Sequence, residues 1–395
     1  MNAAKMTLVS TVLAAAMGLA LGLFLIPAPA VSAPPPGPPP GPSPGGGGGD
    51  VVSVDCATDT IQAAVNNAVG STTIFIQGVC DEVVTINKDD VTLSGNQSGS
   101  EPGPGGTGTI QGTINIVGGS RVGIEFLTVT GSGNGIVGTQ NAAFTIMNSI
   151  IEDNDRSGIV VEHSSSAEIK NSIIRRNGVD FVFSVGVRVS ESSSAHLTDS
   201  EVLNNRNSGL EIARNAAVLM DGNTVQDNGK RPGSPQEDAC GIELNRGGAV
   251  RLNGGNTISN NTLVGICAGD GTIVRQSPLD TTVDTIDQSA PSLALDLFNG
   301  ASADFRQVDI TGNSSVIVLS TLRVRNPSSL LPGPRPSSSM TGNVSVDFQS
   351  GVRIGGTGVT FTGTLSCNNG SFAFFSAVQC GQTCTGAIPG SCSPP

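Results

Sequence analysis

The chain has 395 residues, a formal net charge of −12 and only 13% charged residues, with 53 glycines. This acidic balance disfavours nucleic acid as a partner, because nucleic-acid binding requires a basic face, and it disfavours polyanionic glycans unless a metal or a local basic cluster intervenes. The chain has neither Trp nor Tyr, whose broad aromatic faces usually grip sugar rings. Phe could substitute, although several of the 13 Phe are expected in the core.

Residues 1–33 have the features of a secretory signal peptide. Lys5 is their only charge, an apolar run extends from Met6 to Ile26, and Ala28-Pro29-Ala30 resembles a cleavage site. The apolar run is long for a signal peptide, so an uncleaved membrane anchor is the alternative. Residues 34–50 form a Pro/Gly-rich linker. We therefore expect a secreted or surface-tethered protein, with any membrane contact made only through an uncleaved amino-terminal anchor.

A short amphipathic helix is predicted over Thr58 to Ala68, with Thr58 or Asp59 as its cap. Its apolar residues share one face, which suits a helix covering the open end of a solenoid core. Three short strands follow, each bounded by turn residues; they are Thr73–Gly78, Glu82–Ile86 and Val91–Gly95.

A short phrase containing glycine recurs through the middle of the chain. Its glycines are separated by 23, 28, 23, 32 and 24 residues, at Gly135, Gly158, Gly186, Gly209, Gly241 and Gly265. A fixed period of this length is typical of a solenoid, and the two long steps read as a unit with an insertion. Apolar and polar residues alternate over two strands per unit, which indicates β structure. In one unit, the side chains predicted to point inward are Ile159, Val161, Ala167 and Ile169, whereas Val160 is predicted to point outward.

An Asn precedes each repeat of the phrase. The aligned residues are Asn154, Asn177, Asn205 and Asn228. We interpret them as a structural ladder in which each amide bonds to the coils on either side.

Beyond Arg275 the repeat weakens. Alternating strands return at Leu293–Phe298, Ser315–Asn326 and Asn343–Phe348, and the last coils are expected to end near Phe375. The predicted β-helix domain therefore covers residues 51–375 and is followed by a Cys-rich tail, residues 376–395.

Eight cysteines in an exported chain favour disulfides. Cys56–Cys80 would fasten the amino-terminal cap, and Cys240 and Cys267 lie about one coil apart. The rest form a tail cluster of Cys367, Cys380, Cys384 and Cys392. No zinc-like CxxC is present, and His163 and His196 are expected at the surface, so no metal site is predicted. Calcium is a minor alternative, at Asp280, Asp284 and Asp287.

The opening segments TIQAAVNNA, TTIFIQG, EVVTI and VTLSGN, with the repeats SGIVV…AEIKNSIIRRN and SGLEI…AVLMDGNTVQDN, resemble the pectin-lyase-like right-handed parallel β-helices. The resemblance covers about Val51 to Arg275 and implies an all-β, single-stranded right-handed parallel β-helix with a short amino-terminal capping helix. That superfamily contains polysaccharide lyases, hydrolases, epimerases and non-enzymatic surface proteins. None of its catalytic signatures matches here, so the catalytic residues are unknown.

The two insertions fall at the same turn, directly after Asn177 and Asn228. Two protruding loops around a short turn predict a notch about 10 Å wide, or two strand spacings. Its charged candidates are Arg188, Arg206, Glu211, Lys230, Arg231, Glu237, Asp238 and Glu243, with Asp180 on one wall. Such groups can bind a ligand or perform acid–base chemistry, but Arg188, Glu211 and Glu243 are more simply read as a solvated charge ladder.

The sequence thus favours a module that binds a polysaccharide or a cell-surface component without catalysis. The alternative is a polysaccharide lyase, hydrolase or epimerase acting on a uronic-acid polymer through the notch.

Overall fold

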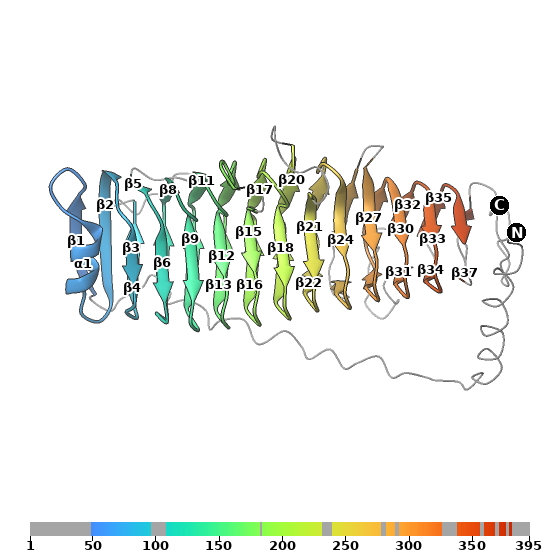
Figure 1. Ribbon diagram of the computed structural model, residues 1–395, viewed down its shortest axis with the longest axis horizontal. Coiled ribbons are helices and arrows are strands. Elements are labelled where there is room, and N and C mark those ends of the chain that lie inside the picture. Colours follow the sequence, from blue (N-terminus) through green and yellow to red (C-terminus); the bar gives the residue numbers. More distant parts are fainter. Residues whose placement is uncertain are drawn as a thin grey trace, which may run out of the picture. The chain divides into compact units, whose positions relative to one another are not determined.

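The computed structural model describes residues 49–95, 108–181, 184–230, 239–277, 282–288, 292–325, 338–355, 359–367, 371–376 and 379–380. The signal-like segment and nearly all of the linker lie outside these residues, as does most of the Cys-rich tail. Within them, all strand pairings are parallel, and each coil pairs with the next (Figure 1). This confirms the predicted parallel β-helix.

Each coil contributes one strand to each of three faces, named sheets A, B and C. Sheet A contains β1 (Asp50–Asp55), β2 (Thr72–Cys80), β4 (Val91–Ser94), β7 (Val122–Glu125), β10 (Ala143–Met147), β13 (Ser166–Lys170), β16 (Ser194–Thr198), β19 (Ala217–Asp221), β22 (Ala249–Leu252), β25 (Ile273–Gln276), β28 (Ser302–Phe305), β31 (Thr321–Arg325), β34 (Gly351–Gly355) and β37 (Phe372–Ser376). Sheet B contains the end of β2 and β5 (Gly108–Gln111), β8 (Leu127–Gly131), β11 (Ile150–Asn154), β14 (Ile173–Arg175), β17 (Glu201–Leu203), β20 (Thr224–Gln226), β23 (Thr257–Ser259), β26 (Asp284–Asp287), β29 (Val308–Thr311), β32 (Ser338–Thr341), β35 (Val359–Thr362) and β38 (Gln379–Cys380).

Sheet C contains β3 (Val84–Ile86), β6 (Ile114–Val117), β9 (Ile136–Thr139), β12 (Ile159–Val161), β15 (Val187–Val189), β18 (Leu210–Ala213), β21 (Cys240–Asn245), β24 (Val264–Ala268), β27 (Leu293–Leu297), β30 (Asn313–Val316), β33 (Val344–Val346) and β36 (Leu365–Cys367). Along the chain the order within a coil is C, A, B. The expectation of two strands per coil was therefore wrong. The sheet B strand is often only three residues long, so a single inward side chain, such as Ile174, leaves no visible alternation.

The core is the inside of the coil. Ile159, Val161, Ala167 and Ile169 point inward and are fully buried, as predicted. Val160 keeps only 6% of its surface exposed although it points outward. It stacks between Val137 and Arg188 of the adjacent coils, and side chains stacked at strand spacing cover one another.

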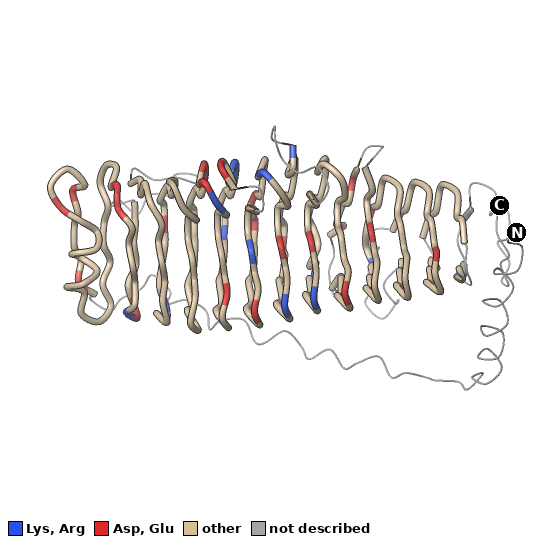
Figure 2. Tube along the Cα trace, viewed as in Figure 1, with Lys and Arg blue, Asp and Glu red and all other residues tan. Residues whose placement is uncertain are grey.

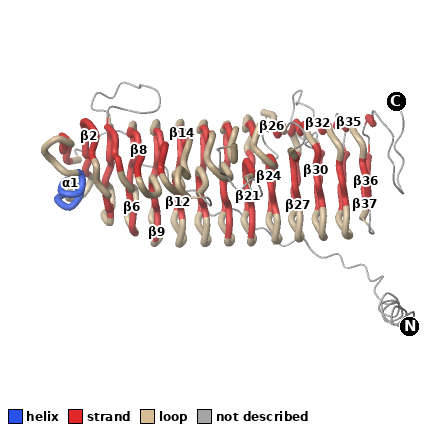
Figure 3. Tube along the Cα trace, turned by 45° about the horizontal axis from the view of Figure 1, so that its top comes forward, coloured by secondary structure: helices blue, strands red, loops and turns tan. Residues whose placement is uncertain are grey.

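Helix α1 (Ile61–Asn67) contacts β1, β2 and β3 of the first coil. Figure 3 shows the helix near β2 at one end of the coils. Its cap is Thr60, whose side chain accepts a hydrogen bond from the Ala63 nitrogen at 3.2 Å, so the predicted cap at Thr58 or Asp59 was wrong. The nitrogens of Thr58 and Asp59 are instead used in a turn that bonds to the Asp55 carbonyl. Among the described residues, no helix has the length and apolar content needed to cross a membrane.

One predicted strand, Ser315–Asn326, is in fact divided between two sheets. β30 ends at Val316 and β31 begins at Thr321. Between them Val318 and Leu319 have positive φ angles of 52° and 58° and turn the chain from sheet C to sheet A. β-Branched and bulky residues rarely adopt this conformation, so their sequence suggested an uninterrupted strand.

Both predicted disulfides in the described region are present. Cys56–Cys80 ties the first strand to β2, and Cys240–Cys267 joins adjacent coils of sheet C with Cα atoms 6.1 Å apart. Cys367 has no disulfide partner among the described residues, and burial raises the pKa of its thiol. The side chain of Cys380 and all of Cys384 and Cys392 lie outside the described part, so the tail pairing stays a prediction.

Candidate functional site

An amide ladder sets the register of the coils beside the predicted notch. The side-chain nitrogen of Asn154 donates to the side-chain oxygen of Asn177 at 2.8 Å, and Asn177 donates to Asn205 at 3.0 Å. The same bond links Asn205 to Asn228 and Asn228 to Asn261, each at 3.0 Å. All five amides are buried. Sequence reasoning missed Asn261, which continues the row.

The recurring glycine has a steric role against this ladder. A Cβ placed on Gly158 would lie 2.7 Å from the Asn177 side-chain nitrogen, and one on Gly186 would lie 2.6 Å from that of Asn205. The backbone of each phrase therefore passes too close to the ladder to accommodate a side chain. This contact fixes where each sheet C strand begins, and with it the outward columns of sheet C.

The register places three of the predicted charges in one outward column. In the strand register, Arg188 of β15 lies opposite Glu211 of β18, and Glu211 lies opposite Glu243 of β21. The Arg188 guanidinium makes two contacts with one carboxylate oxygen of Glu211, at 2.8 and 2.7 Å. The Glu243 carboxylate accepts hydrogen bonds from Ser208 at 2.9 Å and from Asn245 at 3.3 Å. These groups therefore have partners within the protein.

The other notch residues do not converge on one point. Arg206 donates to the carbonyl oxygens of Val179 at 2.5 Å and Gly178 at 3.4 Å, which holds it against the first loop. Lys230 forms an ion pair with Asp227 at 2.8 Å. Arg231, Glu237 and Asp238, which were expected to form the second wall, lie outside the described residues.

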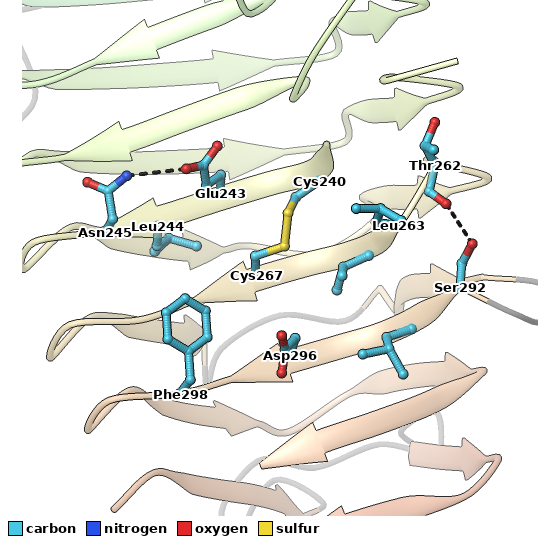
Figure 4. Close-up of a pocket in the computed structure, with 12 residues that line it drawn as sticks. Cys240, Glu243, Leu244, Asn245, Thr262, Leu263, Cys267, Ser292, Asp296 and Phe298 are labelled. Carbon is cyan, nitrogen blue, oxygen red and sulfur yellow. Dashed lines mark hydrogen bonds between the residues drawn. A yellow bond between two sulfur atoms is a disulfide. The ribbon is translucent and has the colours of Figure 1, made fainter. Parts of the chain in front are cut away.

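The described face of sheet C has a groove that begins where the notch column ends. Its volume is about 560 Å³, and its lining comes from β21, β24, β27 and the turns beside them (Figure 4). The column continues into it, since Cys267 pairs with Glu243 and Asp296 pairs with Cys267. The Cys240–Cys267 disulfide therefore lies between the two carboxylates.

Asp296 has an unusual environment. Burial raises the pKa of its carboxyl group, and a hydrogen bond with Ser315 opposes the rise only in part. Its Oδ1 atom is buried and has no hydrogen-bond partner within the described structure. A ligand that brings a hydroxyl or amide donor would satisfy this oxygen. Leu263, Leu293 and Phe298 supply an apolar wall in the same groove.

Sequence reasoning missed Cys267, Asp296 and Phe298 as groove residues. The signal was present, because Cys267 and Asp296 lie 24 and 53 residues after Glu243. For Asp296 it was not followed because the glycine phrase is no longer recognisable beyond Arg275. Cys267 follows Gly265 by two residues, but it was considered only as a disulfide candidate.

Metal candidates are few among the described residues. Glu162, His163 and Glu191 have ligand atoms within 4.8 Å of one another. Glu191 already has partners, since it forms an ion pair with Arg214 at 2.6 Å and lies 2.9 Å from His163 Nε2. The suggested calcium set does not assemble, because Asp284 points into the core and bonds to Asn256 while Asp287 points outward; Asp280 lies outside the described residues.

The chain matches the family described as right handed beta helix region over residues 47–187 and 112–284, which is more than half of its length. It belongs to this family. No curated protein matches the chain. Among solved structures, the similar ones include pectate lyase Pel9A, with 12% identity, a TM-score of 0.48, and coverage of 66% of this chain and 78% of that chain.

Two further solved structures are similar. The mannuronan C-5 epimerase AlgE4 A-module of Azotobacter vinelandii has 16% identity and a TM-score of 0.45, covering 87% of this chain and 97% of that chain. PfbA, a surface adhesin of Streptococcus pneumoniae, has 10% identity and a TM-score of 0.26, covering 81% of this chain and 86% of that chain. Enzymes and an adhesin therefore occur together among the similar structures, and the likeness does not assign an activity.

Proposed function

We propose that this protein is an exported β-helix module, secreted or held at the cell surface, that binds a glycan in the sheet C groove without turning it over. The observation that carries the proposal is the composition of the groove. Phe298, Leu263 and Leu293 offer apolar contact to the C–H face of a sugar ring. Asp296 and Glu243 offer acceptors for its hydroxyls, and Asp296 has an oxygen with no partner.

Export is supported by two features. Disulfides persist in oxidising compartments, and the described region contains Cys56–Cys80 and Cys240–Cys267. The signal-like segment over residues 1–33 is consistent with that location. A membrane-retained form would use the same segment as its anchor.

The pairing of the notch charges supports binding without turnover. A general acid or base must reach the reacting atom in the right protonation state. Arg188 and Glu211 neutralise one another, and Glu243 is held by Ser208 and Asn245. Among the described notch residues, no carboxylate, base and cation converge on one point.

One observation favours a second function, hydrolysis of the bound glycan. Asp296 has a raised pKa, as a general acid requires, and Glu243 lies two strands away on the same face. Two strand spacings place the backbones about 10 Å apart, near the separation of roughly 6.5–9.5 Å between the carboxyl groups of inverting glycosidases.

The test uses the purified protein with a panel of neutral and acidic polysaccharides, with and without calcium. Retention of one glycan that Phe298→Ala or Asp296→Asn weakens about tenfold, without new reducing ends or unsaturated products, supports the binding module. The matched control is Phe348→Ala, since Phe348 is 55% exposed outside the groove. New reducing ends without unsaturated products, lost in Asp296→Asn, would establish hydrolysis. Binding unaffected by both groove variants would refute the proposed site.

A further inference from the structure

The outward face of sheet A carries a cluster of arginines on consecutive coils. In the strand register, Arg251 of β22 lies opposite Arg275 of β25, and Arg275 lies opposite Asp304 of β28. The same column continues through Arg323 of β31 and Arg353 of β34. Arg306 directly follows β28, and Arg325 ends β31. We call these six arginines the arginine column: Arg251, Arg275, Arg306, Arg323, Arg325 and Arg353.

The column is strongly basic in a chain whose net charge is −12. Asp304 is the one carboxylate in register with these arginines. It forms an ion pair with Arg325, through contacts of 3.0 and 2.6 Å. Within the described part of the chain, Arg275, Arg306 and Arg323 form no ion pair. Arg251 donates only to the Ser277 hydroxyl among the contacts described, at 3.0 Å.

The arginines also repel one another. Burial lowers the pKa of the Arg306 guanidinium, and the nearby charge of Arg325 lowers it further. Burial likewise lowers the pKa of Arg323. Arg325 lowers it further, Asp304 opposes the shift, and Arg353 adds to the lowering. The Arg323 Nε atom is buried and has no hydrogen-bond partner in the described structure. Like charges stacked on adjacent strands destabilise a sheet.

The fold itself gives no reason for this arrangement. The residues beneath the column, such as Val274, Ala303, Leu322 and Val352, form an ordinary buried apolar core. In sheet C, Arg188 contacts the carboxylate of its neighbour Glu211. In sheet A, Asp304 lies in register between Arg275 and Arg323 but contacts Arg325 instead. Arg275, Arg306 and Arg323 have no ion-pair partner among the described residues, which points to an anion supplied from outside the chain.

We propose that the arginine column binds a linear acidic polysaccharide, carrying carboxylate or sulfate groups, that lies across the coils of sheet A. Adjacent coils are about 4.8 Å apart, which is close to the length of one pyranose ring linked at its two ends, so successive acidic sugars can meet successive coils. The guanidinium group matches the geometry of carboxylate and sulfate oxygens. A single-stranded nucleic acid fits less well, because its bases stack on aromatic side chains and the chain has no Trp or Tyr, which leaves only Phe for that role. This site is separate from the sheet C groove and goes beyond the function proposed above.

The test measures the affinity of the full protein for polygalacturonate, alginate and chondroitin sulfate, with dextran as the neutral reference. The variant is Arg275→Gln/Arg323→Gln/Arg353→Gln. The matched control, Arg121→Gln/Arg214→Gln/Arg246→Gln, makes the same change in net charge at turns on other coils. We expect one acidic polymer to bind in a salt-dependent manner, the column variant to weaken it at least about tenfold, and the control to change it less than about twofold.

Folding is checked by thermal unfolding, where removal of like charges should leave the column variant at least as stable as the parent. Equal affinity in the parent and the column variant would overturn the proposal. So would the absence of binding to all three acidic polymers at low salt by the folded protein. Equally tight, arginine-dependent binding of a DNA oligonucleotide would overturn the assignment to a polysaccharide. Phe298→Ala should leave this binding unchanged, which separates it from the groove on sheet C.

Discussion

Replacing Asn205 by Ala should remove about 3 kcal/mol of stability. The Asn205 side chain takes part in four hydrogen bonds at a fully buried position. Its nitrogen donates to Asn228 Oδ1 at 3.0 Å and to the Ile174 carbonyl at 3.1 Å, and its oxygen accepts from the side chain of Asn177 at 3.0 Å and from its backbone nitrogen at 3.1 Å. At about 1 kcal/mol for each bond, the sum is about 4 kcal/mol.

Two of the groups bonded to the Asn205 side chain keep another hydrogen-bond partner in the variant, which reduces the expected loss of stability. Asn228 Oδ1 still accepts from the Asn205 backbone nitrogen, and the Asn177 side-chain nitrogen still donates to the Ile151 carbonyl. The Asn177 backbone nitrogen loses its acceptor in a buried site, which costs about 1–3 kcal/mol alone. The net expectation is therefore about 3 kcal/mol.

Urea unfolding followed by circular dichroism measures this difference. The matched control is Asn115→Ala, because Asn115 points outward from sheet C and its side chain has no hydrogen bond in the described structure. If unfolding proceeds in stages, as stacked coils allow, amide exchange in β15 and β18 gives the local value. A difference below about 0.5 kcal/mol between the two variants would refute the ladder as a source of stability.

Three other changes test the same framework. Gly186→Ala should lower the melting temperature, with a cost of about 1–3 kcal/mol, because its Cβ would lie 2.6 Å from the Asn205 side-chain nitrogen. Replacing both Cys240 and Cys267 by Ser should cost about 3 kcal/mol in urea unfolding, since the bond closes a separation of 27 residues. Asp296→Asn should be more stable than the parent at neutral pH, with the gain disappearing on acidification. The reason is that the raised pKa of Asp296 contributes stability below the ordinary carboxyl pKa of about 3.9, which is lost as the pH rises through the raised value.

The inward side of the coils could be predicted from the sequence because it obeys a strict rule. Apolar residues alternate with polar ones, and the glycine period matches the observed register, in which Ile159 pairs with Val187 and Val187 with Leu210. The ends of elements were less predictable. The start of α1 depends on which side chains reach the free backbone nitrogens of its first turn. One of them comes from Glu82, whose carboxylate accepts hydrogen bonds from the nitrogens of Ile61 and Gln62.

The outward columns were predicted only as far as the repeat could be followed. Arg188, Glu211 and Glu243 lie in register because each follows the phrase glycine by two residues. Past Arg275 the ladder amide gives way to Gln288, whose longer side chain is buried with neither amide atom hydrogen-bonded in the described structure. Without the Asn and Gly landmarks, the register of Asp296 and Arg323 depends on tertiary pairing.

Charge pairing separates the two outward columns in physical terms. Figure 2 shows the acidic and basic residues along the coils. In a stack with a spacing of about 4.8 Å, an opposite charge on the next coil is stabilising and a like charge is destabilising. Arg188 beside Glu211 satisfies this rule within the protein, so that pair is explained by the fold. Glu211 beside Glu243 and Arg251 beside Arg275 both break it. Glu243 is bound by Ser208 and Asn245, whereas Arg251 and Arg275 form no ion pair within the described structure, so an anion from outside would offset their cost. The charge on sheet A is therefore the stronger indication of a ligand than the notch that the insertions suggested.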